Sequence, residues 1–473
     1  MKRSKRIITL VAVLVAVCTA TFALTKYEKK QEEIQNSDAV ILEIPVDTVE
    51  SLSWEYTEDG LAFHKGTDGW LYDGDETFPV SEDKISDILS HFEAFGVSFI
   101  IENVEDYSQY GLDKPECVIR LSAADQSYEL KLGDFSKMDE QRYVDIGDGN
   151  VYLVSQDPMD YLVSELSGMI LHDDTPDFEN VADIQFTGSE NYSITYIEES
   201  TDTYNEDDVY FTGKDGKNLP LDTDKVTNYL DTVSSLSLLN YVTYNATDAE
   251  LESYGLDEPE LSVTVNYTYT DDDEKDISDT CILHISRNPE ELKAAEEAEA
   301  NEEEEIPAVT KYIRIGDSQI VYELDDSAYS ILAAASYDDL RHKEVIWADF
   351  GIVTQIDITL EEESHSITSV LDEKDESNDR IWYYGEEEID INDLQSTLAG
   401  LSADSFTDET PDQKEEISLI VYLDNENFPQ VKIQLYRYDG SLCLAVVDGE
   451  SISLVDRSAV MDLVEAVQAI VLN

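Results

Sequence analysis

The sequence contains few of the residues that build catalytic and metal centres. It has 4 cysteines and 6 histidines among 473 residues, and no CxxC pair. The histidines are scattered, without two at the spacing of a zinc-binding pair: His64, His91, His172, His284, His342 and His365. The phosphate-binding loop GxxxxGKS/T, a dinucleotide fingerprint and the GxSxG nucleophile elbow are also absent. These absences exclude an ATPase and predict a non-enzymatic chain with no catalytic residues, no cofactor and no metal.

Cysteines beyond the N-terminal region number only three, and each stands in an apolar, strand-like run. They are Cys117, Cys281 and Cys443. An odd number of cysteines without a paired spacing disfavours a disulfide framework. We therefore expect three free, buried thiols that act as small hydrophobic side chains.

Positive charge is scarce, because 30 lysines and arginines face 106 acidic residues and give a net charge of -76. Such a surface repels nucleic-acid phosphates and anionic lipid headgroups. The chain is nevertheless 42% hydrophobic and 10% aromatic, which is typical of a folded protein and not of a disordered one. We expect a soluble, acidic extramembrane portion that does not bind nucleic acid.

A long hydrophobic run occurs at the N-terminus. Lys2 and Arg3 precede the apolar or small residues Ile7–Leu24, which as a helix would span roughly 27 Å, close to the hydrocarbon core of a bilayer. Residues 1–25 are therefore expected to be a transmembrane anchor, followed by a polar tether at 26–38. The basic flank places the N-terminus inside the cell and the acidic bulk outside it.

A cleaved signal peptide is the alternative interpretation of this region. Cys18-Thr19-Ala20 and Thr21-Phe22-Ala23 both resemble small-x-small cleavage sites, and cleavage would make the protein secreted. A lipoprotein is less favoured, because Val17 stands before Cys18 where a lipidation site has a small residue.

A six-residue motif occurs twice. The copies are Tyr110-Gly111-Leu112-Asp113-Lys114-Pro115 and Tyr254-Gly255-Leu256-Asp257-Glu258-Pro259. The glycine suits a positive φ, and the proline fixes the chain as it enters a strand. Asp113 and Asp257 are expected to cap backbone groups in their own turns; a carboxylate pair or metal ligands are the alternative.

Further matches follow in the same order, which predicts tandem repeats. The first repeat is expected at 39–171, the second at 172–343 and a degenerate third at 344–473, where the motif is replaced by Phe406–Pro411. The matched segments are Phe78–Leu89 with Leu219–Leu230, Arg142–Asp148 with Lys311–Asp317, and Val151-Tyr152 with Val321-Tyr322.

Each repeat is predicted to be an antiparallel sheet with one helix after its first strands and another at its end, which makes an α+β fold. The first of these helices is expected to start at an N-cap, Ser81, and to place five apolar residues on one face: Ile85, Ile88, Leu89, Phe92 and Phe95. The closing helices are expected at Asp157–Ile170 and Ser458–Val471. An acidic insertion at 288–306 is expected to be a solvated helix or a disordered loop without a face for a core.

The motif, the downstream Ile-Gly-Asp sequence and the Val-Tyr strand together resemble the bacterial family catalogued as domain of unknown function 4340, most clearly over residues 47–343. The resemblance implies a membrane-anchored protein that accompanies gliding-motility-type ABC transporter components. It supplies no catalytic residues.

Two functions follow as expectations. The first is a non-enzymatic, extracytoplasmic accessory or scaffold protein on the bacterial membrane, with transporter subunits as partners. The second is a cell-envelope binding module that holds cations or wall polymer through acidic loops. Aromatic residues could form sugar or peptide platforms, but their places in strand-like runs favour core packing for Trp54, Trp70, Trp347 and Trp382.

Overall fold

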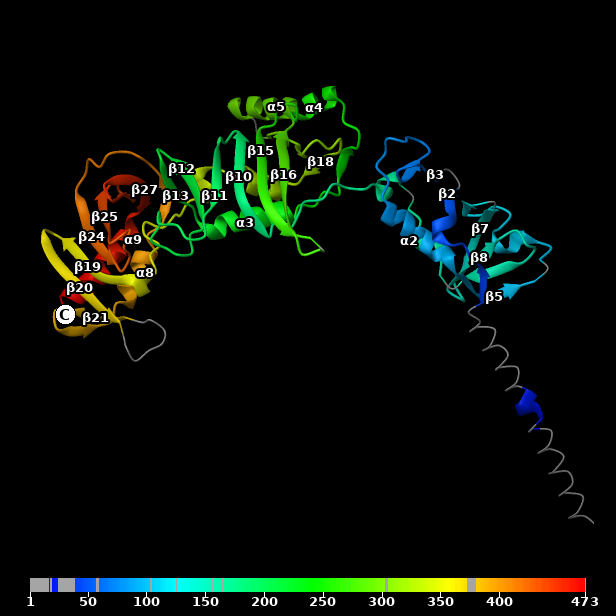
Figure 1. Cartoon of the computed structure of the whole chain (residues 1–473), viewed down its shortest axis with the longest axis horizontal. Helices are drawn as coiled ribbons and strands as arrows, with labels where there is room; N and C mark the ends of the chain where they lie inside the picture. The colour runs from blue at the N-terminus through cyan, green and yellow to red at the C-terminus, as the bar shows by residue number, and fades with distance from the viewer. Residues whose placement is uncertain are drawn as a thin grey trace, which may run out of the picture. The chain divides into compact units, whose positions relative to one another are not determined.

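Three antiparallel sheets of nine strands each form the described chain. The computed structural model describes Val17, residues 19–23 and residues 39–472, except for gaps at 57–58, 103, 125, 155, 164, 272, 303–304 and 372–379. The chain divides into two compact parts, Met1–Asp173 with the first sheet and Asp174–Asn473 with the second and third sheets (Figure 1).

The expected transmembrane span, Ile7–Leu24, falls mostly outside the described residues, as does the tether at 26–38. Val17 and residues 19–23 are helical. Within the described ranges, we find no helix with the length and apolar character needed to cross a bilayer.

The first sheet has the strand order β1-β5-β9-β8-β7-β6-β2-β3-β4. Its strands are β1 (Ala39–Leu42), β2 (Val49–Tyr56), β3 (Gly60–Lys65), β4 (Trp70–Tyr72), β5 (Phe95–Ile101), β6 (Cys117–Ala123), β7 (Gln126–Ser136), β8 (Gln141–Asp145) and β9 (Val151–Val154). The helix α2 (Glu82–Glu93) lies between β4 and β5 in sequence.

The second sheet has the order β13-β12-β11-β10-β15-β16-β17-β18-β14. Its strands are β10 (Asn180–Gly188), β11 (Tyr192–Tyr196), β12 (Tyr210–Lys214), β13 (Lys217–Pro220), β14 (Tyr241–Thr243), β15 (Leu261–Thr270), β16 (Asp276–Arg287), β17 (Lys311–Ile315) and β18 (Val321–Leu324). Its helices are α3 (Thr223–Ser234), α4 (Asp248–Tyr254), α5 (Pro289–Ala300), α6 (Asp326–Ala333) and α7 (Tyr337–Leu340).

The third sheet has the order β22-β21-β20-β19-β24-β25-β26-β27-β23. Its strands are β19 (Val353–Leu360), β20 (Glu363–Leu371), β21 (Arg380–Tyr384), β22 (Glu387–Ile389), β23 (Ala403–Phe406), β24 (Glu415–Leu423), β25 (Gln430–Arg437), β26 (Leu442–Val447) and β27 (Glu450–Asp456). Its helices are α8 (Asn392–Ala399) and α9 (Arg457–Val471).

The second and third sheets have the same topology. In each, four hairpin strands precede a helix, one strand follows at the far edge, and four more strands fill the space between. The first sheet follows the same scheme with β2–β4, α2, β5 and β6–β9, but it adds β1 beyond β5 and has no strand in the place of β13 or β22. This confirms the prediction of three tandem, related α+β units.

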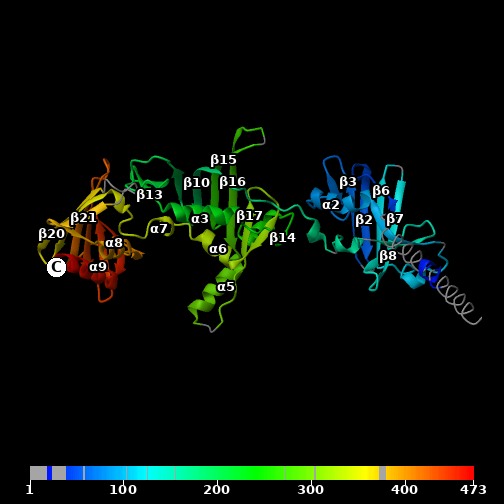
Figure 2. The same ribbon diagram turned by 90° about the horizontal axis from the view of Figure 1, so that it is seen from below.

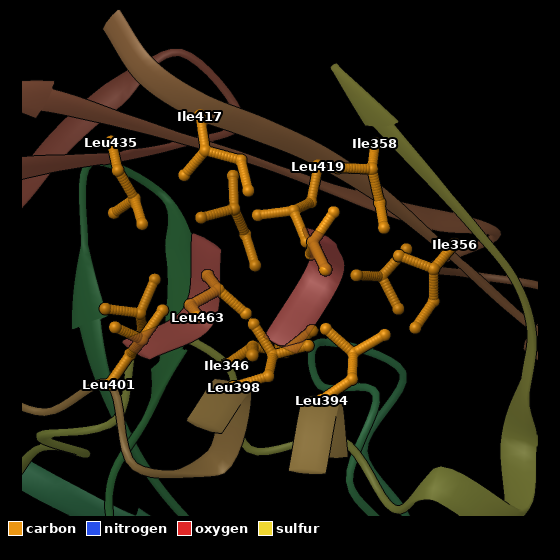
Figure 3. Close-up of a cluster of buried hydrophobic side chains, with 14 of the residues drawn as sticks. Ile346, Ile356, Ile358, Leu394, Leu398, Leu401, Ile417, Leu419, Leu435 and Leu463 are labelled. Atoms are coloured by element: carbon orange, nitrogen blue, oxygen red, sulfur yellow. The ribbon is translucent and has the colours of Figure 1, made fainter. Parts of the chain in front are cut away.

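One helix of each repeat covers the apolar face of its sheet. Figure 2 shows α3 lying across the strands of the second sheet, where the rings of Tyr229 on α3 and Phe186 on β10 are 5.7 Å apart. In the third repeat, Figure 3 shows Leu394 and Leu398 of α8 among strand side chains such as Ile356 and Leu419, all nearly inaccessible to solvent. Alternate residues of the strands and residues on one face of α8 therefore pack together in one core.

The helix α2 begins where the sequence predicts, because the Ser81 side chain accepts a hydrogen bond from the Lys84 N–H at 3.3 Å. The predicted helical face was wrong at its end. Phe95 is buried, but it begins β5, since the helix stops at Glu93 and the following apolar run pairs with β9. A run rich in aromatic and β-branched residues favours the strand.

The closing helix predicted at Asp157–Ile170 was wrong. This segment contains only two short 3₁₀ turns, Pro158–Asp160 and Leu166–Met169. Trp54 Nε1 donates to the Val163 carbonyl at 2.7 Å, and the Tyr56 hydroxyl donates to the Leu162 carbonyl at 3.1 Å. Two carbonyls that an α-helix would use are thus bonded to side chains of β2. In the third repeat the closing helix exists as α9.

The acidic insertion forms the helix α5, and both views show it standing apart from the second sheet. The expectation that it has no buried face was wrong, because Ala295 and Ala298 are buried. The helix packs beside α4, and the Asn288 side chain caps its first turn. Small alanine methyl groups provide a contact that a pattern based on large apolar residues overlooks.

The three cysteines of the sheets are free and buried, as predicted. Burial raises the pKa of Cys117, Cys281 and Cys443 to about 11 in each case. At pH 8 we therefore expect a thiolate fraction of roughly one in a thousand.

A chain with Cys18→Ser should thus resist a thiol-specific reagent at pH 8 while folded, and all three remaining thiols should react in concentrated urea. Labelling is followed by mass spectrometry. Fast labelling of any of the three in the folded chain would contradict the buried placement.

Candidate functional site

The repeated motif ends a helical turn in both copies. Gly111 follows the 3₁₀ turn Tyr107–Tyr110, and Gly255 follows α4. Both glycines have φ +72°, which confirms the predicted positive φ. The left-handed conformation favours glycine, because a Cβ atom there would crowd the backbone.

The leucine after each glycine closes the turn. Leu112 N–H donates to the Tyr107 carbonyl at 3.1 Å, and Leu256 N–H donates to the Leu251 carbonyl at 2.8 Å. Both leucines are buried. A left-handed glycine followed by this longer-range bond and a buried apolar residue is the Schellman arrangement of a helix end.

The tyrosine that opens each motif packs on a tyrosine of the second matched segment. Tyr110 lies 5.0 Å from Tyr143 and Tyr254 lies 4.7 Å from Tyr312, measured between ring centroids. The interplanar angles are 53° and 52°. In each repeat, the six-residue motif is therefore in direct contact with the matched segment Arg142–Asp148 or Lys311–Asp317.

Asp113 and Asp257 do not act as the expected caps. Both are exposed, and no hydrogen bond from a described residue reaches either carboxylate. The residues after them have clearer roles, because Pro115 and Pro259 stand just before β6 and β15. The motif is thus a structural turn in each repeat.

Each motif is followed by a glutamate that binds an arginine of its own sheet. Glu116 accepts from Arg142 Nη1 at 2.7 Å, and Glu260 accepts from Arg287 Nε at 3.0 Å. Arg142 is also bonded to Asp157 at 2.7 Å, and the side chains of these two residues are nearly buried. These ion pairs connect the turn to the sheet.

The candidate functional site is a cleft within the second compact part, with a volume of about 500 Å³. It lies between the β11–β12 loop and β13 on one side and loops and strands of the third sheet on the other, with the connecting segment 337–347 beside it. Its lining residues are Asp202, Thr203, Tyr204, Lys217, Asn218, Leu219, Pro220, Tyr337, Arg341, His342, Lys343, Glu344, Val345, Trp347, Phe406, Phe428, Val447, Asp448, Ile452 and Ser453.

A buried carboxylate lies beside this cleft and is bonded to three of its lining residues. Asp208 is 2% exposed and accepts three side-chain hydrogen bonds. They come from Thr203 Oγ1 at 2.5 Å, His342 Nε2 at 2.8 Å and Trp347 Nε1 at 3.0 Å. A buried charge is tolerated when it is bonded in this way. Asp208 therefore holds the connecting segment against the second repeat.

Aromatic rings continue this contact into the third repeat. Trp347 stacks on His342 with ring centroids 4.3 Å apart, and Tyr204 lies 5.0 Å from Trp347 and 5.9 Å from Phe428. The backbone N–H of Trp347 donates to the Tyr204 hydroxyl oxygen at 3.4 Å. Burial raises the pKa of Tyr204, so its hydroxyl stays protonated over the physiological range.

One group beside the cleft has ligand atoms spaced for a metal ion. Atoms of Asp222, His342 and Glu344 lie within 4.8 Å of one another. Lys225 Nζ, however, lies 3.9 Å from Asp222 Oδ2 and donates to the Arg341 carbonyl at 2.7 Å. The ammonium group already supplies positive charge to this cluster, so we assign no metal to it.

Sequence patterns did not single out the residues that line the cleft or the carboxylate beside it. Asp208 and His342 are 134 positions apart, and neither stands in a motif. Core packing was correctly predicted for Trp54 and Trp382, which are buried, whereas Trp347 is partly exposed and forms a wall of the cleft. A tryptophan in the segment connecting two repeats was the available signal.

The left-handed turn can be tested with Gly255→Ala. The new Cβ would lie 2.7 Å from Ser286 Oγ and 3.1 Å from the Arg287 carbonyl, at a positive φ. We expect a loss of about 1–2 kcal/mol in the free energy of unfolding, measured in urea. The control is Gly213→Ala in β12, where the added methyl meets open space and no positive φ applies; equal losses in both variants would contradict the assignment.

The buried carboxylate can be tested with Asp208→Asn, which keeps the shape but turns one acceptor into a donor. We expect a loss of about 2 kcal/mol in the free energy of unfolding and a change in tryptophan fluorescence, because Trp347 loses its charged partner. The matched control is the exposed neighbour, Asp207→Asn, which should stay within about 0.5 kcal/mol. Identical unfolding curves for the two variants would refute this role of Asp208.

A family model described as "Domain of unknown function (DUF4340)" matches the chain twice, at residues 70–259 and 212–419. The matches begin at Trp70 in β4 and at Thr212 in β12, two strands that hold the same place in their sheets. Comparisons with curated proteins and with solved structures gave no match. Because the two matches together cover more than half of its length, the chain belongs to the family of domain of unknown function 4340.

Proposed function

We propose that this protein is a non-enzymatic accessory or scaffold protein, anchored to a bacterial membrane by its N-terminal segment and exposing its three sheets on the extracytoplasmic side. Its partners in this proposal are subunits of a gliding-motility-type ABC transporter. The basic residues before Ile7 and the strongly acidic remainder of the chain support this orientation.

The observation that carries the proposal is the open polar face of the sheets. In β15, Leu261, Val263 and Val265 are buried under the helices, while the alternate residues Ser262 and Thr264 are partly exposed. Burial alternates in the same way along the corresponding central strands β6 and β24, whose less buried faces add Val118, Ile420 and Tyr422 to polar residues such as Ser122 and Ser418. A rigid sheet with one apolar, covered face and one polar face is suited to presenting a docking surface.

The chemistry of the described residues also favours a binding role. The buried Asp208 carboxylate beside the cleft accepts hydrogen bonds from residues of the second repeat and of the connecting segment, and the motif residues build turns. The acidic loops give less support to a cation-binding module, because the Asp271 carboxylate is used within its own loop, where it accepts from Asp273 N–H at 3.0 Å and Lys275 N–H at 2.8 Å.

Purification of the full chain from mildly solubilised membranes tests the proposal. We expect integral-membrane subunits of a transporter to be recovered with it and to be identified by mass spectrometry. Recovery of the protein by itself would contradict a transporter partner.

Arginines on the open faces sharpen this experiment, because a long charged side chain should block docking against a flat sheet. The test variant carries one arginine on each sheet, at Ser122, Thr264 and Ser418. The control carries arginines at positions in turns, namely Thr67, Thr201 and Ser441. We expect the test variant to lose the partner while the control keeps it; equal recovery would rule out the sheet faces as the docking surface.

A further inference from the structure

The cleft contains a buried hydroxyl group without a partner. Ser453 on β27 is 1% exposed and lines the cleft, and its Oγ has no hydrogen bond to any described residue. Burying a hydroxyl without a hydrogen bond is unfavourable, so such groups are rare and call for an explanation. A ligand in the cleft would supply the missing partner.

An arginine packs on the ring of the residue that is paired with Ser453 across the sheet. Ser453 is the direct cross-strand partner of Phe406 on β23, so their side chains stand together on one face of the sheet. The guanidinium carbon of Arg341 lies 4.0 Å from the centroid of the Phe406 ring and 5.0 Å from that of Tyr337. Two rings thus hold a planar set of N–H donors near the Ser453 hydroxyl.

The guanidinium has spare donor capacity. Its hydrogen bond within the described residues is a long one, 3.3 Å from Nη1 to Oδ1 of the exposed residue Asp338. A guanidinium carries five N–H groups and prefers planar anions such as carboxylates. Arg341 therefore retains donors for a ligand.

Two carboxylates of the lining are already bonded within the protein. Asp202 Oδ2 accepts from Asn218 Nδ2 at 2.8 Å, and Asp448 Oδ1 accepts from the Lys432 N–H at 2.8 Å. Both acids are exposed. Neither forms an ion pair with Lys217, Arg341 or Lys343 among the described residues, and the acidic partner of Arg341 there is the exposed Asp338.

The lysines that line the cleft are more available to a ligand than its carboxylates. Glu344 Oε2 lies 3.9 Å from His342 Nδ1, whereas Lys217 and Lys343 are exposed and form no ion pair among the described residues. The formal charges of the lining balance, with Lys217, Arg341 and Lys343 against Asp202, Glu344 and Asp448. The two lysines without ion pairs and the spare guanidinium donors favour an anion.

The lining of the cleft is rich in aromatic rings: Tyr204 packs beside Trp347 and Phe428, and Phe406 lies against Arg341. A volume of about 500 Å³ lies in the range of pockets that enclose small molecules. Such walls favour an apolar or aromatic body beside the charged group.

We propose that this cleft binds a small organic acid, an apolar body that carries one carboxylate. The Ser453 hydroxyl and the Arg341 guanidinium donate to the carboxylate oxygens, and the aromatic walls contact the body. Binding of such a ligand does not depend on the accessory role proposed above, because the cleft lies within one compact part and is assayed without any partner.

Calorimetric titration of the full chain with three probes tests this assignment. Phenylacetate carries both the ring and the charge, 2-phenylethanol carries the ring without the charge, and acetate carries the charge without the ring. We expect saturable binding of one phenylacetate per chain and at least about tenfold weaker binding of the other two. No saturable heat with phenylacetate at millimolar concentrations, or equal binding of 2-phenylethanol, would overturn the proposal.

Two substitutions locate the binding. Arg341→Gln and Ser453→Ala should each weaken phenylacetate binding, by about tenfold for the charged donor and less for the hydroxyl. Ser453→Ala should leave the unfolding midpoint unchanged or raise it, because the hydroxyl has no partner to lose and its burial is unfavourable, so weaker binding would not be due to a loss of stability. The matched control is Arg437→Gln, at an exposed arginine of β25. Unchanged affinity in Ser453→Ala, or an equal loss in Arg437→Gln, would refute the assignment.

Discussion

The bonded carboxylate of Asp208 is the interaction on which the second compact part depends. It orders the β11–β12 loop through Thr203, and it holds His342 and Trp347, which lead into the third repeat. Without three donors, a charge at this depth would be strongly unfavourable. The junction of two repeats and the cleft beside it are therefore consequences of one satisfied buried charge. The arrangement combines residues from one repeat with a segment that belongs to neither sheet.

Local patterns in the sequence predicted most of the sheets. Alternating apolar residues are sufficient for strands such as β2 and β6, and the Ser81 cap marks the start of α2. The predictions failed where distant side chains decide the conformation. The Asp157–Ile170 segment has helical spacing, but Trp54 and Tyr56 of β2 bind its carbonyl groups. A single sequence does not reveal such competition, because it acts between residues more than a hundred positions apart.

The same limit applies to the candidate site. The repeated motif could be recognised because a short sequence segment occurs twice. In each copy it is a helix end with a left-handed glycine. The cleft recurs nowhere in the sequence, and its members come from loops, from an edge strand and from a connecting segment. The repeated segments therefore identified the framework of sheets, whereas the candidate site lies in segments that differ between the repeats. This division is expected when loops carry function on a shared framework.

The alanine contact of α5 has a consequence for the electric field around the protein. Because Ala295 and Ala298 are buried and this glutamate-rich helix packs beside α4, its charges form a fixed array and not a fluctuating one. The electric field of a fixed array of charges has a definite direction, and it reaches over a Debye length of roughly 8 Å at physiological salt. Approaching molecules of like sign are turned away from that flank, so encounters with the second repeat are biased toward its other sides.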